Sequence, residues 1–251
     1  MKKKVAFIFL CLSLTFVSGQ ELSVKNQKTV QNFIETIKTK NKEKISKIVS
    51  YPLKREYPIS EIKNKNELLK RFDEIFDDKL MSLIVKSKIK TDWSEMGWRG
   101  IMLLDGEVWL NSTGELIAVN YQSQFEKKKK EELIAAQKNS LYESLRNFKS
   151  PVCILETSKY RIRIDDMGNE KFRYASWKFQ QSMSEKPELV MLNGKVEFDG
   201  SGGNHSFIFK TGEYIYECGI VEMGEDDAPP AYISVRKGEK EILSQNAKIK
   251  K

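Results

Sequence analysis

The feature that most constrains the fold is a long series of short strand-like segments in the C-terminal part of the chain. Apolar and polar side chains alternate within these segments, a pattern typical of antiparallel sheets. The segments predicted as strands are 152–155, 160–164, 172–179, 189–192, 195–198, 206–209, 213–218, 231–235 and 241–243. The turns expected between some of them are Asn193-Gly194, Thr211-Gly212 and Lys237-Gly238. Residues 151–251 are therefore predicted to form an all-β antiparallel barrel or sandwich.

The N-terminal part begins with helical periodicity instead. The first helix is predicted from four apolar residues that recur at spacings suited to one helix face, namely Val30, Phe33, Ile34 and Ile37. A short second helix is expected around Ile45, and a third over residues 65–76 with Asn64 as its N-cap. Residues 51–59 are expected to be extended, because proline disfavours helix in the residue before it.

A second sheet is predicted after these helices. Its expected strands are 81–89, 97–104, 107–110 and 115–121, with Asp105-Gly106 as a hairpin turn. A long charged helix is expected over 125–148, followed by a boundary at Ser150-Pro151. The predicted fold class is thus α+β, with an N-terminal domain over 20–124, a connecting helix over 125–150 and an all-β domain over 151–251.

The order of these N-terminal elements resembles the NTF2-like (SnoaL-like) cone fold over about residues 24–122. The segments Tyr51-Pro52-Leu53-Lys54-Arg55-Glu56-Tyr57-Pro58, Phe76-Asp77-Asp78-Lys79-Leu80, Gly100-Ile101-Met102-Leu103 and Gly106-Glu107-Val108-Trp109 are also similar to secreted bacterial proteins of uncharacterised function. The resemblance implies a sheet curved around helices. Enzymes of this type generally place an acid–base pair such as Asp and His in the cone, whereas the single histidine of this chain, His205, lies outside that region.

The first nineteen residues are predicted to be a cleavable secretory signal peptide. Lysines at positions 2–4 precede an apolar run over 5–17, which the small residues Ser18 and Gly19 follow. Export to the periplasm or the extracellular space is therefore expected. Lipidation at Cys11 is the alternative, but the residues before it are large. A transmembrane segment is not expected in the mature chain, because no second apolar run of about 18 residues occurs.

The pattern of charge argues against a nucleic-acid partner. The chain has a formal net charge of +8, but Glu131 and Glu132 directly follow the lysine run 127–130 and neutralise it on a helix. Nucleic-acid binding is therefore not expected.

Cys153 and Cys218 both lie in predicted strands, and the sequence leaves open whether they form a disulfide or remain two buried free thiols.

The sequence contains no motif that specifies a reaction. The glycine-rich stretch 200–203 precedes His205, but it leads into a predicted strand and not into the helix that a phosphate-binding loop requires. The acidic segments 165–170 and 225–227 lack the alternating spacing of a calcium loop, and one histidine supplies neither a zinc site nor a catalytic triad. No catalytic residue, metal site or cofactor is predicted.

One cluster of side chains is a candidate for a ligand pocket in the cone. Its members are Arg55, Trp98, Arg99, Asp105, Trp109 and Tyr121. Aromatic residues with a few polar groups suit a concave binding site, but they suit a protein core equally well. Arg55 is expected either to bind an anion or to form a buried ion pair, and the ion pair is favoured.

Two functions follow from these residues. The first is an exported, non-catalytic protein that binds a protein, a glycan, a small ligand or an envelope component. The alternative is a small-molecule enzyme of the hydrolase or isomerase type that uses the cone pocket. In that enzyme Asp92 or Asp105 would be the general base and Arg99 the electrostatic stabiliser.

Overall fold

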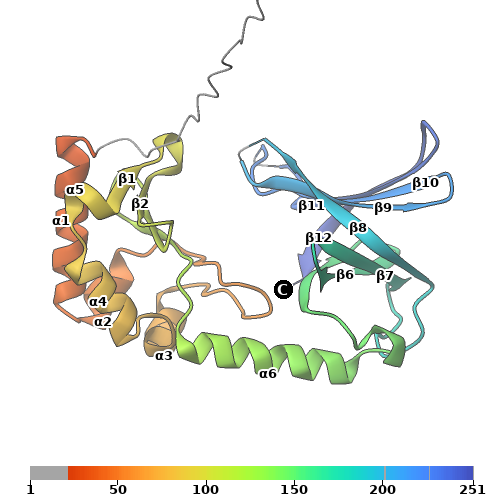
Figure 1. The fold of residues 1–251 in the computed structure, drawn as a ribbon, viewed down its shortest axis with the longest axis horizontal. Helices are drawn as coiled ribbons and strands as arrows, with labels where there is room; N and C mark the ends of the chain where they lie inside the picture. The colour runs from red at the N-terminus through yellow and green to blue at the C-terminus, as the bar shows by residue number, and fades with distance from the viewer. Residues whose placement is uncertain (1–21, 201, 226, 251) are drawn as a thin grey trace, which may run out of the picture. The chain divides into compact units, whose positions relative to one another are not determined.

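The structure is a computed structural model that describes residues 22–200, 202–225 and 227–250 (Figure 1). The predicted signal peptide, residues 1–19, lies outside the described residues. The chain divides into two compact units, each assembled from two separate stretches of sequence. One unit contains the chain up to Ser50 together with Asp78–Val119, and the other contains Tyr51–Asp77 together with Asn120–Lys251.

The first unit combines helices with a small antiparallel sheet. Its helices are α1 (Val24–Lys38), α2 (Lys42–Lys47), α4 (Asp78–Lys86), α5 (Ile89–Asp92) and the 3-10 turn η1 (Gly97–Arg99). Its strands follow the order β1 (Trp93–Glu95), β2 (Ile101–Leu103), β3 (Val108–Leu110) and β4 (Leu116–Val119). The predicted first helix is confirmed, and its four apolar residues are all buried. The Phe33 ring meets the Trp93 ring edge-on, with 6.0 Å between their centroids.

The predicted strand over 81–89 is wrong, because this segment is helical. Leu80, Met81 and Ile84 are its buried residues, and their spacing matches one face of helix α4. The predicted strand over 97–104 is also shorter than expected. Gly100 has φ 105°, and a Cβ there would lie 2.2 Å from the Leu110 carbonyl oxygen, so the backbone turns at this residue before β2 begins.

The helices of the second unit are α3 (Lys65–Ile75), α6 (Gln124–Ser140) and the 3-10 turn η2 (Glu143–Leu145). The side chain of Asn64 accepts a hydrogen bond from the Glu67 amide at 3.1 Å, which confirms it as the N-cap of α3. Ser123 caps α6 in the same way, accepting from the Glu126 amide at 3.0 Å.

Helix α6 ends earlier than the sequence predicts. It was expected to continue to residue 148, but it stops at Ser140, and the Tyr142 amide donates to the Met183 carbonyl oxygen at 3.0 Å. The apolar residues beyond Ser140 are buried in a separate cluster that consists of Leu141, Leu145, Phe148, Ala175 and Trp177. The chain leaves the helix because this packing on the sheet buries more apolar surface than a longer, exposed helix would.

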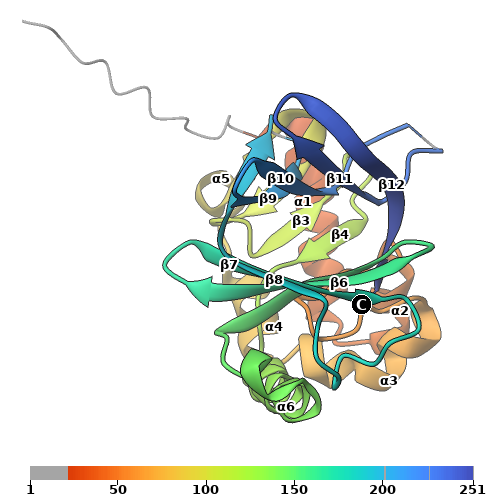
Figure 2. The same ribbon diagram turned by 90° about the vertical axis from the view of Figure 1, so that its right-hand side faces the viewer.

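The rest of the second unit is a closed antiparallel barrel of eight strands, which confirms the barrel prediction in the C-terminal part (Figure 2). The strands are β5 (Ser150–Glu156), β6 (Tyr160–Gly168), β7 (Lys171–Lys178), β8 (Leu189–Asp199), β9 (Asn204–Thr211), β10 (Tyr214–Ile220), β11 (Ala231–Lys237) and β12 (Lys240–Lys250). Each strand pairs with the next along the chain, and β12 closes the ring on β5, with Ile249 opposite Leu155. This connectivity leaves no free edge in the ring.

Two of the predicted strands, 189–192 and 195–198, are one continuous strand, β8. The expected hairpin turn at Asn193-Gly194 is instead an irregularity in the pairing with β7, where Phe172 lies opposite Gly194 and Tyr174 opposite Met191. A Cβ on Gly194 would lie 2.1 Å from the Phe209 ring. Glycine at this position therefore allows an aromatic ring of the core to touch the strand backbone, and the irregularity lets β8 bend around the barrel.

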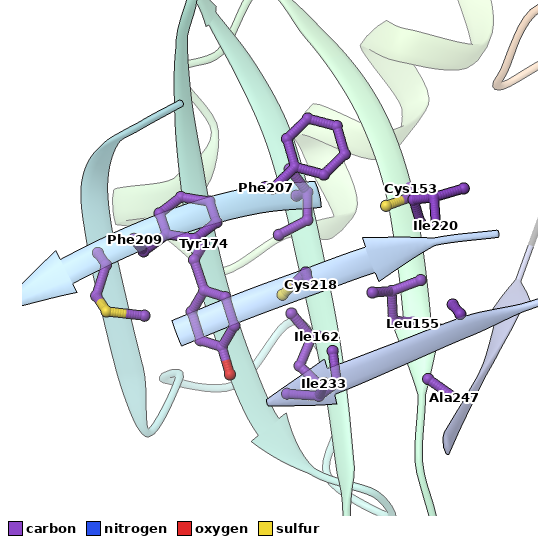
Figure 3. Close-up of a cluster of buried hydrophobic side chains, with 13 residues drawn as sticks. Cys153, Leu155, Ile162, Tyr174, Phe207, Phe209, Cys218, Ile220, Ile233 and Ala247 are labelled. Atoms are coloured by element: carbon purple, nitrogen blue, oxygen red, sulfur yellow. The ribbon is translucent and has the colours of Figure 1, made fainter. Parts of the chain in front are cut away.

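The interior of the barrel is filled mainly by apolar side chains that alternate inward along each strand (Figure 3). The Phe172 and Phe207 rings lie 4.9 Å apart, and the Tyr174 and Phe209 rings 5.5 Å apart. Cys153 and Cys218 belong to this core as two buried free thiols. The sequence left open whether they form a disulfide or remain free, and the structure has them free.

Across the residues that the structure describes, the helices are all too short or too polar to cross a membrane.

Candidate functional site

One hollow among the described residues lies inside the barrel. Strand alternation turns Tyr174 of β7, Tyr216 of β10 and Ile233 of β11 toward the barrel axis, where they border a cavity of about 400 Å³. The cavity lies toward the end of the barrel that carries the β5–β6 and β7–β8 connections, since Thr157, Tyr160 and Glu188 line it.

The wall of the cavity is mixed in chemistry. Its apolar part consists of Ile162, Leu189, Ile233, Val235, Ile242 and Leu243. Its polar part consists of Thr157, Tyr160, Tyr174, Ser176, Glu188, Tyr216 and Gln245. Many apolar side chains with a limited number of hydrogen-bonding groups are typical of a site for a small molecule.

Some of the polar groups in the wall are already engaged by the protein. The Thr157 hydroxyl oxygen accepts from the Tyr160 amide at 2.9 Å and thereby holds the β5–β6 turn. The Glu188 carboxylate lies 3.2 Å from Lys178 Nζ, and its side chain is 42% exposed, so it belongs to the rim.

Gln245 differs from these groups. It lies on β12 directly opposite Ile233, and its Oε1 atom is buried without a hydrogen-bond partner among the described residues. A buried acceptor without a partner costs about 1–3 kcal/mol. The atom has almost no accessible surface, so it is enclosed within the wall and is not open to the cavity.

Tyr174 and Tyr216 of the wall remain protonated over the physiological range. Burial raises the pKa of Tyr174 far above its usual value, and burial also raises the pKa of Tyr216. Both hydroxyls are therefore neutral groups that can donate as well as accept hydrogen bonds.

The outer face of the barrel carries a buried ionic cluster that is separate from the cavity wall. Asp165 Oδ1 lies 2.7 Å from Arg163 Nε, and Asp165 Oδ2 lies 2.6 Å from Arg173 Nη2. Arg173 also donates to the Leu145 carbonyl oxygen at 2.6 Å, and Arg163 donates to Gln137 Oε1 at 2.9 Å. These contacts hold α6 and the segment after it on strands β6 and β7.

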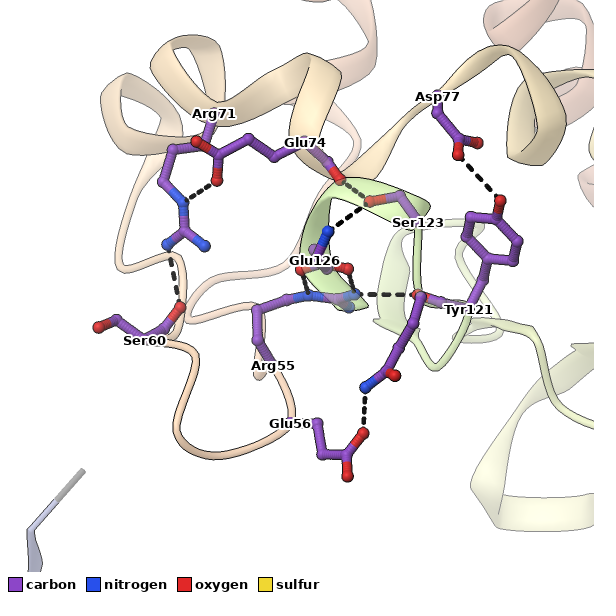
Figure 4. Close-up of polar contacts among 10 residues, drawn as sticks. Arg55, Glu56, Ser60, Arg71, Glu74, Asp77, Tyr121, Ser123 and Glu126 are labelled. Carbon is purple, nitrogen blue, oxygen red and sulfur yellow. Dashed lines mark hydrogen bonds and ion pairs between the residues drawn. The ribbon is translucent and has the colours of Figure 1, made fainter. Parts of the chain in front are cut away.

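Arg55 forms the buried ion pair that was favoured from the sequence (Figure 4). Its Nε donates to Glu126 Oε1 at 2.7 Å, and its Nη2 contacts Glu126 Oε2 and donates to the Tyr121 carbonyl oxygen at 2.9 Å. The Tyr121 hydroxyl donates to Asp77 at 2.9 Å. Both Arg55 and Tyr121 therefore tie the segment 51–77 to the start of α6.

The other four candidates of the predicted pocket belong to the first unit. Trp98 is 67% exposed, Arg99 and Asp105 are exposed, and Trp109 is half-buried against Gly106. None of the six lines the barrel cavity.

The carboxylates proposed for the alternative enzyme do not have the environment of a general base. Asp92 accepts hydrogen bonds from the Lys88 amide and the Thr91 hydroxyl, and the amide bond is the main cause that lowers its pKa. A general base near neutral pH needs the opposite shift. Asp105 is exposed in the turn between β2 and β3.

The barrel cavity was not found from the sequence, although its signal was present. The alternation in each predicted strand identifies the inward residues, and three tyrosines are among them, namely Tyr160, Tyr174 and Tyr216. Alternation alone does not show that the strands close into a ring, which is what turns one sheet face into a cavity.

Within the described part of the chain, no three His, Cys, Asp or Glu side chains are grouped so that they could hold a metal ion. Comparison of the chain with protein-family models, with curated proteins and with solved structures finds no match.

Proposed function

We propose that this chain is an exported, non-catalytic binding protein whose barrel holds one small, largely apolar ligand. The observation that carries the proposal is the cavity of about 400 Å³ inside the closed eight-stranded barrel. Barrels of eight strands have an interior wide enough for side chains or for one small ligand, and ligand sites range from about 300 to 1,000 Å³.

The balance of groups in the wall supports binding rather than turnover. Glu188 is the one charged side chain among the described lining residues, and it is paired with Lys178 at the rim. A reaction needs a nucleophile or base held against an electrostatic stabiliser, whereas binding needs apolar contact and a few orienting hydrogen bonds.

The location and the N-terminal fold belong to the same proposal. Export is supported by the basic and apolar pattern of residues 1–19. An NTF2-like fold is proposed for the N-terminal part on its element order, helices followed by the antiparallel meander β1–β4. The ligand-binding role does not depend on either.

The experiment that tests the proposal fills the cavity from the inside. Val235 lines the cavity. Val190 is 40% exposed and faces away from the barrel interior, because it lies opposite Ala175, which packs in the cluster beneath α6. We expect Val235→Trp to abolish the fluorescence gain of the neutral dye N-phenyl-1-naphthylamine, because the indole occupies the space of the dye.

The matched control is Val190→Trp, which makes the same chemical change on the outer face and should leave dye binding within about twofold of the unmodified protein. Circular dichroism and thermal unfolding establish that both variants are folded. Equal dye binding by the two folded variants, or no binding by the unmodified protein, would refute the proposed site.

A further inference from the structure

We propose that the first unit binds an anionic lipid surface through a lysine patch where helix α1 turns into α2 (Figure 1). The patch consists of five exposed lysines within ten residues, namely Lys38, Lys40, Lys42, Lys44 and Lys47. This function is separate from ligand binding in the barrel, because the cavity is lined by residues of the second unit alone.

The charge density of the lysine patch is the first observation behind this proposal. Residues 38–47 contain five lysines and one carboxylate, that of Glu43, so their formal charge is +4. The whole chain of 251 residues has a formal net charge of +8. Ten residues therefore carry half the net charge of the chain, and such a local excess attracts a surface with many negative charges.

Most of the lysine patch is not neutralised by the protein itself. The Lys38 ammonium lies 2.8 Å from the Glu35 carboxylate. Lys40, Lys44 and Lys47, in contrast, form no ion pair with any residue that the structure describes. Three ammonium groups of the patch are therefore available to an external anion.

The residue at the tip of the turn is the second observation. Lys40 has φ 51°, and its amide donates to the Ile37 carbonyl oxygen at 3.0 Å where α1 ends. Glycine is the usual residue at this position after a helix, because a side chain is strained in the left-handed conformation. No ion pair within the described chain rewards a lysine here, and a local rule that is broken without a structural gain indicates a functional position.

The composition of the lysine patch favours lipid headgroups over nucleic acid. Its cations are all lysines, which act as point charges and suit phosphates spread over a membrane surface. Recognition of nucleic acid uses arginine forks and aromatic rings, and residues 38–47 contain neither. The single apolar residue of the stretch, Ile45, is buried, so attachment is by charge and not by insertion into the hydrocarbon.

The test measures cosedimentation of the protein with lipid vesicles. Residues 20–251 are used, because they include every described residue and omit the apolar run 5–17, which would itself bind lipid. We expect binding to vesicles of equal parts phosphatidylglycerol and phosphatidylcholine, and none to vesicles of phosphatidylcholine alone. Raising sodium chloride from about 0.05 M to about 0.5 M should release the protein, because salt screens exposed charges.

Two triple variants assign the binding to the lysine patch. The first combines Lys40→Gln, Lys44→Gln and Lys47→Gln, and we expect it to bind the anionic vesicles about a hundredfold more weakly. The reason is that each lysine close to an anionic membrane contributes about fivefold to the affinity.

The matched control removes the same three charges from exposed positions of α6, where Glu131 and Glu132 follow the lysines. It combines Lys127→Gln, Lys128→Gln and Lys129→Gln, and it should bind the vesicles within about threefold of the unmodified protein. None of the six lysines lines the barrel cavity, so both variants should keep the dye binding of the unmodified protein. Circular dichroism and thermal unfolding establish that both are folded.

Three results would overturn the proposal. The first is no binding of the unmodified protein to the anionic vesicles. The second is an equal loss of binding in the two triple variants, which would assign the attraction to overall charge and not to the lysine patch. The third is tighter binding to duplex DNA than to the vesicles at equal phosphate concentration, which would identify nucleic acid as the partner.

Discussion

At the residue scale, the most consequential contacts are buried ion pairs between residues far apart in the sequence. Arg55 and Glu126 are separated by 71 positions, and their side chains are only 3% and 1% exposed. A buried charge is tolerated because its partner is present, so such a pair contributes more to the choice of one structure than to net stability.

We predict that Glu126→Leu lowers the free energy of unfolding by about 3–5 kcal/mol, because it leaves the Arg55 guanidinium buried without its carboxylate. The double variant Arg55→Met with Glu126→Leu should recover most of that loss. Urea denaturation measures both. Glu132→Leu, on the exposed side of α6, is the control and should change stability by less than about 1 kcal/mol. A Glu126→Leu variant as stable as the control would contradict the importance of the pair.

At the element scale, the barrel depends on one strand that bends where a hairpin was expected. Asn193 has φ 62°, and Gly194 leaves room for the Phe209 ring. The dipeptide Asn-Gly satisfies a turn and a bulge equally well, because both need a residue that tolerates positive φ and a small neighbour. The ring of Phe209 therefore decides between the two, and it is supplied by another strand.

We predict that Gly194→Ala destabilises the protein by about 1–3 kcal/mol, because its methyl group has to displace a packed ring. A double-mutant cycle with Phe209→Leu gives the measurement. The added methyl should cost clearly less in the Phe209→Leu background, where the ring is gone. Additive effects of the two changes would show that the ring is not what requires glycine.

At the scale of the whole molecule, burial of two thiols in the barrel core links stability to alkaline pH. Burial raises the pKa of Cys153 to about 12, and the pKa of Cys218 lies well above its usual value for the same reason. Unfolded thiols ionise near pH 8.5, so above that pH the unfolded state binds fewer protons than the native state, and stability falls as the pH rises.

We expect the free energy of unfolding to decrease between about pH 8.5 and 10 by up to about 1.4 kcal/mol per pH unit for each thiol. Urea denaturation across this range measures the slope. A variant with Cys153→Ala and Cys218→Ala should have a clearly shallower slope, since the tyrosines ionise only at higher pH in the unfolded state. Equal slopes for the two proteins would mean that the thiols are not buried as the structure has them.

The sequence alone determined the local elements whose pattern is unambiguous. The apolar residues of α1, the Asn64 cap of α3 and most strands of the barrel follow from side-chain periodicity, which depends only on neighbours along the chain. The wrong predictions concern segments whose pattern suits two structures. The run 81–89 is apolar enough for a strand, but it forms the end of α4 and the start of α5. The apolar residues after Ser140 suit a longer helix, but they pack in a separate cluster.

Only the tertiary structure decided the site. Five of the six pocket candidates follow from their position on or near the strands expected to line the cone, and Arg55 follows from its place in the segment with two prolines. Burial and pairing depend on the tertiary structure, in which Trp98 is exposed and Arg55 is paired with Glu126. The cavity exists because β12 pairs with β5, almost a hundred positions away, and so closes a sheet face into an enclosed interior. Closure of the barrel and the partner of Arg55 both depend on which distant residues meet, and side-chain periodicity carries no information about that.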